Sequence, residues 1–164
     1  MESLRELLVY QLSVLHSAEQ QLVTALPELA EAASSDRLRL ALDDHWEVSQ
    51  GQITRLAAIF DSLGERPTGK KCVAMAGLIA EACDILEKEG LPEVKDAALI
   101  GAAQQIEHYE MSAYGTARAL AETLGLATIA DQLQETLDEE RDADTQLNNL
   151  AVSEINDNAF AASV

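Results

Sequence analysis

Four stretches of this chain place an acid or a histidine where an amphipathic helix would place its apolar stripe. In the first stretch leucines recur at steps of three and four residues, and Glu19 takes the position between Leu15 and Leu22. A side chain in that phase points toward the core of a helical protein. Burying carboxylates without compensation costs several kcal/mol each, so a cation or hydrogen-bond partners must offset the cost. The inward polar residues of the four stretches are Glu19, His45, Glu107 with Glu110, and Glu140 with Asp144.

These residue types suit a metal site. Carboxylate oxygens bind hard and borderline cations, and the imidazole of His45 shifts the preference toward iron, manganese or zinc. Glu107 and Glu110 are three residues apart and Glu140 and Asp144 are four apart, so each pair shares a helix face. Oxygen and imidazole ligands converging from four helices are typical of two-metal carboxylate sites in helical bundles. Each residue alone has another interpretation, namely a solvated acid or a hydrogen-bonded core histidine.

Four further side chains flank these candidates. We expect Tyr114 either to hydrogen-bond a metal ligand or to pack in the core. One residue turns a helix by about 100°, so His108 is predicted to face a neighbouring helix or a partner chain rather than the metal. Trp46 is expected to pack in the bundle, and His16 either to be exposed or to lie behind Glu19.

The elements that must position these residues are long helices. Ser3 with Glu6 forms a capping box, Ser35 lies in a short turn before a second helix, and Gly64 is placed as a helix stop. Pro27 lies inside the first helix, where a kink is expected. The predicted helices cover residues 3–33, 36–63, 71–88, 93–124 and 127–155, within a domain of residues 1–156, and residues 157–164 are expected to form a disordered tail.

Two long-helix hairpins therefore flank a long connection that contains its own short helix. Such a connection can run the length of a bundle, which favours a ferritin-like four-helix bundle with one long crossover. The composition agrees, because 48% of the residues are apolar but only 4% are aromatic, and Ala, Leu, Glu and Gln dominate. The predicted fold class is all-α, in one domain.

Charge and cysteine usage restrict the environment and the partners. A formal net charge of -18 argues against nucleic acid and anionic membrane surfaces. No apolar run approaches the length of a membrane span, and the N-terminus lacks signal-peptide features, so a cytoplasmic location is expected. Cys72 and Cys83 lie too far apart along one predicted helix to form a disulfide, so both are interpreted as reduced thiols.

The combined motifs resemble the YciF-like family of bacterial stress-induced proteins. The resemblance spans nearly the whole chain and implies a ferritin-like, rubrerythrin-related bundle, a homodimer, and a dinuclear metal centre. Carried over residue by residue, it implies ligands at Glu19, His45, Glu107, Glu110 and Glu140. The motifs that carry it are Ser17–Leu22 with Ala25–Pro27, His45, Lys71–Cys72 with Met75 and Gly77–Leu78, Glu107–Glu110 with Ala113–Gly115, and Leu137–Glu140 with Asp144.

Two features depart from the rubrerythrin pattern. That pattern has a glutamate on the second helix and a histidine on the fourth, whereas Leu42 or Val48 and Asp144 occupy these neighbourhoods here. The leading hypothesis is a centre of two iron ions, with manganese or zinc as alternatives, acting on peroxide or oxygen. A second hypothesis is a non-enzymatic stress protein that binds metal as a helical homodimer. A third hypothesis is a structural protein in which water molecules form hydrogen bonds with the buried polar groups.

Overall fold

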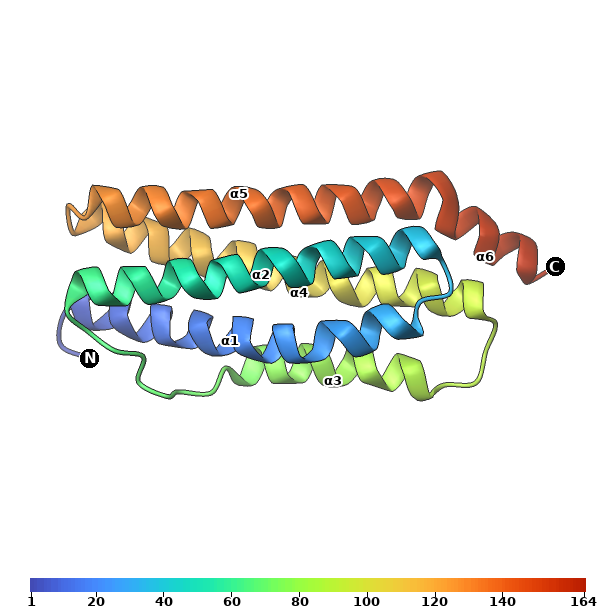
Figure 1. Ribbon diagram of the computed structural model, residues 1–164, viewed down its shortest axis with the longest axis horizontal. Helices are drawn as coiled ribbons and strands as arrows, with labels where there is room; N and C mark the ends of the chain where they lie inside the picture. Colours follow the sequence, from blue (N-terminus) through green and yellow to red (C-terminus); the bar gives the residue numbers. More distant parts are fainter.

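The computed structural model describes all residues from Met1 to Val164, and its regular structure is entirely helical. Figure 1 shows the long helices running side by side along the molecule. The elements in chain order are α1 (Leu4–Ala32), α2 (Asp36–Leu63), α3 (Val73–Glu87), α4 (Pro92–Thr123), α5 (Ala127–Leu150), the π-helical turn η1 (Ala151–Ile155) and α6 (Asn156–Ala162).

The helix ends follow from local chemistry. Ser3 Oγ accepts a hydrogen bond from the backbone N–H of Glu6 at 3.2 Å, and Ser35 Oγ accepts one from Leu38 at 3.3 Å. Gly64 ends α2 in the left-handed region, with φ of 68°, where a side chain would be strained. Pro92 begins α4, where its missing N–H is not needed. The predicted bounds of the first four helices, and the start of the fifth, are confirmed to within about two residues. The predicted end of the fifth helix, near residue 155, is where η1 ends after α5 stops at Leu150.

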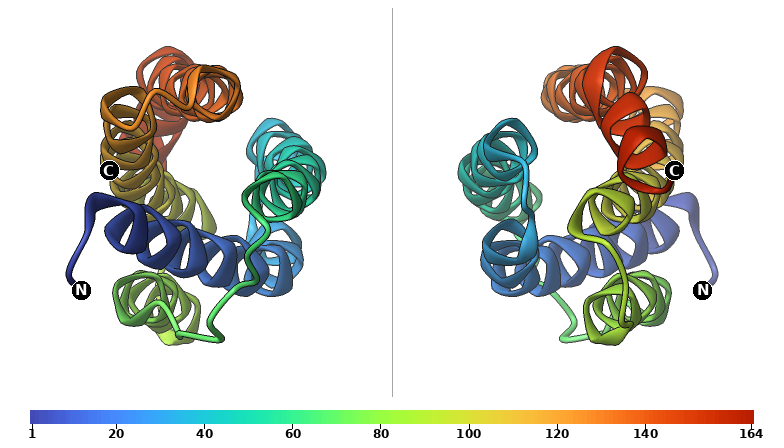
Figure 2. Two further views of the ribbon diagram at one scale, coloured as in Figure 1. Left: turned by 90° about the vertical axis from the view of Figure 1, so that its left-hand side faces the viewer. Right: turned by 90° about the vertical axis from the view of Figure 1, so that its right-hand side faces the viewer.

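The bundle is built from two hairpins and one crossover. Figure 2 shows α1 beside α2 on one side and α4 beside α5 on the other, with α3 lying outside the four long helices. In the crossover, α3 packs against both α1 and α4. The prediction of an all-α four-helix bundle with a long crossover and an extra short helix is therefore confirmed.

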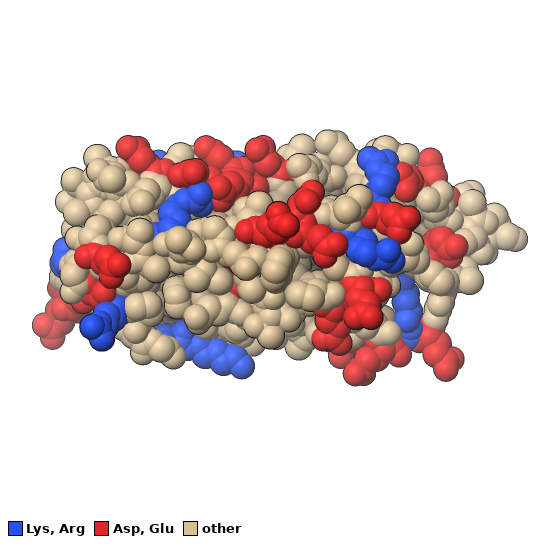
Figure 3. All heavy atoms as spheres, in the orientation of Figure 1, with Lys and Arg blue, Asp and Glu red and all other residues tan.

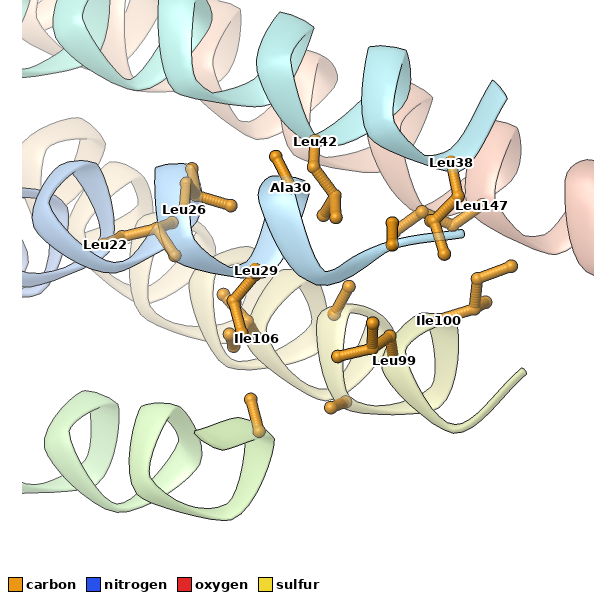
Figure 4. Packing of buried hydrophobic residues seen from close by; sticks show 14 of the residues in the cluster. Leu22, Leu26, Leu29, Ala30, Leu38, Leu42, Leu99, Ile100, Ile106 and Leu147 are labelled. Atoms are coloured by element: carbon orange, nitrogen blue, oxygen red, sulfur yellow. The ribbon is translucent and has the colours of Figure 1, made fainter. Parts of the chain in front are cut away.

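The core is divided into two apolar parts. One part, shown in Figure 4, includes Leu22, Leu26 and Ile106, and the other includes Leu12 and Leu15. Between Leu15 and Leu22 the same stripe of α1 carries Glu19, which is completely buried. A polar layer therefore crosses the middle of the bundle and separates the two apolar parts.

Pro27 leaves a backbone acceptor without its helical donor, and a tryptophan supplies the replacement. Helix α1 continues through Pro27, whose ring nitrogen cannot donate to the carbonyl of Val23 four residues earlier. The indole Nε1 of Trp46 on α2 donates to that carbonyl at 3.1 Å. Trp46 thus packs within the bundle, as predicted, and it also ties α2 to α1.

The C-terminal end differs from the expected disordered tail. After α5 the chain makes the π-helical turn, which places Ile155 in the core, and continues as α6 against α4. The apolar periodicity is weak in this segment, and Phe160 is largely exposed. Tertiary contact with α4, which is not visible in the sequence pattern, accounts for the difference.

Two smaller expectations concern the cysteines and membranes. Cys72 and Cys83 are unpaired, and Cys72 is the N-cap of α3 rather than a residue inside that helix. None of the helices combines the length and the apolar character that crossing a bilayer requires.

Candidate metal centre

Four buried side chains from three helices meet in the polar layer. One ligand atom each from His45 on α2, Glu107 and Glu110 on α4, and Glu140 on α5 lie within 4.8 Å of one another. The three carboxyl groups are at most 1% exposed and His45 is 8% exposed. We call these four residues the cluster. The sequence-based expectation that they converge is met by this arrangement.

Two of the three distances from His45 to the carboxyl groups match the spacing of ligands around an ion, and the third is a hydrogen-bond distance. His45 Nδ1 lies 2.7 Å from Glu107 Oε1, and His45 Nε2 lies 3.9 Å from Glu110 Oε2 and 4.0 Å from Glu140 Oε2. Ligand atoms that each bind one ion at about 2.1 Å stand about 3 to 4.2 Å apart. The separations around Nε2 fall within that range, so a single transition metal ion fits with small side-chain adjustments.

Several polar atoms of the layer have no hydrogen-bond partner, although they are buried. They are both carboxylate oxygens of Glu110, Oε2 of Glu107, Oε2 of Glu19, and Nε2 of His45. Buried groups of this kind normally find a partner, because an unsatisfied one costs about 1–3 kcal/mol. Oxygen and imidazole donors without partners are the donor set that a divalent transition metal requires.

The carboxyl groups resist ionisation in this layer, mainly because they are buried. Burial, with repulsion from Glu140, raises the pKa of Glu19 to about 8. Burial likewise raises the pKa of Glu107 to about 8, and it raises the pKa values of Glu110 and Glu140 well above the ordinary carboxyl value. A cation would reverse this preference, because it favours the charged form of each neighbour.

Glu19 lies beside the cluster and is held by a tyrosine. The O–H of Tyr114 donates to Glu19 Oε1 at 2.6 Å, and both side chains are completely buried. Both alternatives considered for Tyr114 therefore hold: its O–H bonds a candidate ligand, and its ring packs in the core. The remaining oxygen of Glu19, Oε2, has no hydrogen-bond partner, and its carboxyl group neighbours Glu110. Glu19 itself is not one of the four residues of the cluster.

Asp144 does not join the cluster. Its Oδ1 accepts a hydrogen bond from Gln104 Nε2 at 2.9 Å and lies 3.3 Å from His108 Nε2. Four residues advance a helix by about 40° beyond a full turn, which is enough to turn Asp144 from the layer toward α4. His108 accordingly faces a neighbouring helix, as predicted, and remains largely exposed.

The sequence interpretation missed a hydrogen-bonded chain that reaches the cluster from the surface. Gln52 Nε2 donates to Glu140 Oε1 through a short contact and to Glu139 Oε2 at 3.1 Å. Arg55 in turn donates to both oxygens of Glu139 at 2.8 Å. Gln52 occupies the inward stripe of α2, and this position was the available signal.

Comparisons with known proteins agree with this architecture. Residues 3–160 match the model of a domain of unknown function, DUF892. The chain belongs to this family. A DUF892 relative from Escherichia coli K12, protein YciF, is 43% identical over 160 residues, covering 97% of this chain and 96% of the relative.

Solved structures extend the comparison. The crystal structure of the E. coli stress protein YciF has a TM-score of 0.92 at 43% identity and covers 95% of this chain and 99% of its own. YcfI of Rhodopseudomonas palustris, described as a candidate structural protein, has a TM-score of 0.87 at 40% identity over 90% and 94% of the two chains. A Xanthomonas campestris protein, 16% identical with a TM-score of 0.79 over 99% of this chain and all of its own, shares the fold.

Proposed function

We propose that this DUF892 protein is a stress-response metalloprotein whose polar layer binds two transition metal ions and reacts with peroxide or oxygen. Iron is the first expectation for both ions, with manganese or zinc as alternatives. One observation carries the proposal: four ligand atoms of carboxylate and imidazole type converge within 4.8 Å in a buried layer. The stress role is suggested by the E. coli relative, which is described as a stress protein.

The chain's own side chains prepare the layer for such ions. Glu107, which lies beside both His45 and Glu140, would be shared by the two ions, and Glu19 would contribute an oxygen to the second. Tyr114 holds one oxygen of Glu19 and Gln52 holds one oxygen of Glu140, so these hydrogen bonds limit how far each carboxylate must move when a cation binds. Bound redox-active metals would supply Lewis acidity and electron transfer. The apolar parts on either side close the layer along the axis of the bundle.

Metal content and turnover measured on one preparation test the proposal. Protein purified from its own host should contain about two iron or manganese ions per chain, and it should consume peroxide or oxidise added Fe²⁺. Protein that binds neither ion near neutral pH, at saturating concentration, would show that the layer is not a metal site.

A second candidate is metal binding without turnover. The layer contains a single imidazole, His45, and Leu42 or Val48 stands in the neighbourhood where the rubrerythrin pattern has a glutamate on the second helix. The R. palustris relative is described as a candidate structural protein. Protein that holds redox-active ions yet neither consumes peroxide nor oxidises Fe²⁺ would favour this function over the enzymatic one.

We also propose that the protein acts as a cytoplasmic homodimer. Exposed apolar side chains on the long helices, such as Leu40 and Val48 on α2, support a protein partner. Light scattering at micromolar concentration should give about twice the chain mass of 17.7 kDa, and a purely monomeric species would contradict the dimer.

A further inference from the structure

A cavity of about 240 Å³ lies between α2 and α5 and reaches the cluster. Its inner end is formed by His45, Glu107 and Glu140, and its walls include Leu42 and Leu147. In Figure 2 α2 and α5 stand apart across the open side of the bundle, whereas the helices within each hairpin lie close together. The cavity therefore occupies the seam where the two hairpins meet on that side.

The outer part of the cavity is acidic. Asp44 on α2, with Glu139 and Asp142 on α5, lines it, and both aspartates are exposed. Figure 3 shows acidic side chains gathered over the middle of α2 and α5 on one face. Arg55 pairs with Glu139, whereas Asp44 and Asp142 form no salt bridge. Two uncompensated carboxylates therefore stand at the outer rim.

The inner end of the cavity includes His45, whose imidazole can bind a cation. His45 is more exposed than the three carboxyl groups of the cluster, and it lines the cavity. Its Nε2 is buried and has no hydrogen-bond partner. A cation that arrives through the seam would thus meet the imidazole of His45 at the end of an acidic passage, with the buried Nε2 just behind the cavity wall.

We propose that this cavity is the access route through which hydrated divalent cations reach the cluster. The proposal rests on the metal-binding function proposed above and adds the path and the chemistry of what passes along it. A shell of six waters occupies roughly 180 Å³ at about 30 Å³ per water, which the cavity can hold. Carboxylates at the rim raise the local concentration of cations and repel anions, and the effect weakens as salt increases.

The rate of Co²⁺ uptake by the full-length protein tests the route. Stopped-flow absorbance follows the visible bands of protein-bound Co²⁺ near neutral pH, at low and at high ionic strength. Three variants are compared with the wild type: a rim variant with Asp44→Asn and Asp142→Asn, a plugged variant with Ala143→Leu, and a control with Asp61→Asn and Asp131→Asn. The control removes the same charges from exposed positions elsewhere on α2 and α5.

The expected result separates rate from capacity. The rim variant should load about three- to ten-fold more slowly than the wild type at low salt and should approach it at high salt. The plugged variant should load slowly at both salt concentrations, while final Co²⁺ per chain stays unchanged in all variants and the control loads like the wild type. Equal loading rates in every variant, or equal slowing of the control, would overturn the route alone. A wild type that takes up no Co²⁺ would overturn the proposed metal binding together with it.

Discussion

At the scale of single residues, Glu107 and Asp144 show how little rotation separates a ligand candidate from a surface contact. Both lie on inward stripes in the sequence, yet Glu107 is completely buried against His45, while Asp144 pairs with Gln104 and His108. Residue type and stripe position predict the first placement correctly. The placement of Asp144 depends on how α5 is rotated about its axis relative to α4, and only the packed bundle defines that rotation.

Replacing Glu107 by Gln should remove the bound metal. Glu107 is the central carboxylate of the cluster, so the amide should leave fewer than about a tenth of wild-type ions bound under conditions that saturate the wild type. The apoprotein should melt at the same temperature or higher, because a desolvated carboxyl group has been removed. Metal analysis and thermal melts check both outcomes. Asp144→Asn is the matched control and should keep most of its metal; retention of metal by Glu107→Gln would contradict the bridging role.

Replacing Gln52 by Leu should weaken metal binding without abolishing it. Gln52 donates to Glu140 and Glu139, and loss of such an outer hydrogen bond typically costs about 10- to 100-fold in metal affinity. A competition titration with a chelator measures the affinity, and the number of ions at saturation should be unchanged. Gln50→Leu, an exposed position on the same helix, is the control; equal affinities in the two variants would show that Gln52 only fills space.

The roles of Gln52 and Glu139 lay beyond sequence reasoning for a physical reason. An amide on a helix stripe carries no charge that would mark it as chemically unusual, and Glu139 is an ordinary acid beside Glu140. Their roles depend on hydrogen bonds between α2 and α5. These bonds join residues that lie 87 and 88 positions apart in the sequence. For Tyr114 the sequence left open both hydrogen bonding to a ligand and packing in the core, and the structure shows both.

At the scale of helices, one buried carboxylate joins the first hairpin to the second. Asp96 on α4 is 2% exposed and accepts three hydrogen bonds from the turn between α1 and α2. The donors are Ser34 N–H at 2.9 Å, Ser34 O–H at 2.6 Å and Ser35 N–H at 2.8 Å. Asp96 therefore fixes the point where α2 begins, and with it the direction in which α2 carries His45.

Replacing Asp96 by Ala should destabilise the bundle. Three charge-assisted hydrogen bonds would be lost, which corresponds to about 3 kcal/mol of unfolding free energy and, for a chain of this length, a fall of roughly 6–12 °C in melting temperature. Chemical denaturation and thermal melts measure the loss. Asp131→Ala, at an exposed position of α5, is the control. It should change the unfolding free energy and the melting temperature by only a small fraction of the Asp96→Ala effect. Equal changes in both variants would contradict this role of Asp96.

Helix boundaries were predictable to different degrees along the chain. Ser3, Ser35, Gly64 and Pro92 carry local signals that act within one turn of the helix, and each lies where the structure places an end. The predicted fifth helix extends through the π-helical turn to residue 155, but neither the π-helical geometry of that turn nor α6 carries such a signal. Both depend on packing against α4, so neither was predictable from periodicity.

At the scale of the whole molecule, the polar layer makes stability depend on pH in opposite ways with and without metal. The pKa values of Glu19 and Glu107 rise from 4.5 to about 8 in the folded state. Between these values the folded chain binds more protons than the unfolded chain, so unfolding free energy decreases as pH rises. Protonation thus stabilises the metal-free bundle fully below about pH 4.5, and this contribution is lost as pH rises through about 8.

The melting temperature of metal-free protein should therefore fall between pH 5 and pH 8. The corresponding loss of unfolding free energy is on the order of a few kcal/mol. Protein saturated with Mn²⁺ should show the reverse trend, because deprotonated carboxylates bind the ion and binding stabilises the folded state. The Glu107→Gln variant should have a shallower metal-free slope. Parallel pH profiles with and without Mn²⁺ would contradict a metal site in the layer.

The hydrogen bond between Trp46 and the carbonyl of Val23 gives the molecule a built-in optical reporter. Trp46 is the single tryptophan of the chain, and it is adjacent to His45 in sequence. Its emission therefore comes from one place, at the contact between α1 and α2 beside the polar layer. Binding of an open-shell ion should quench this emission, while opening of the first hairpin should shift it to longer wavelength. The same fluorescence signal can thus distinguish a chain that gains metal from one that loses its helix contact, without any added label.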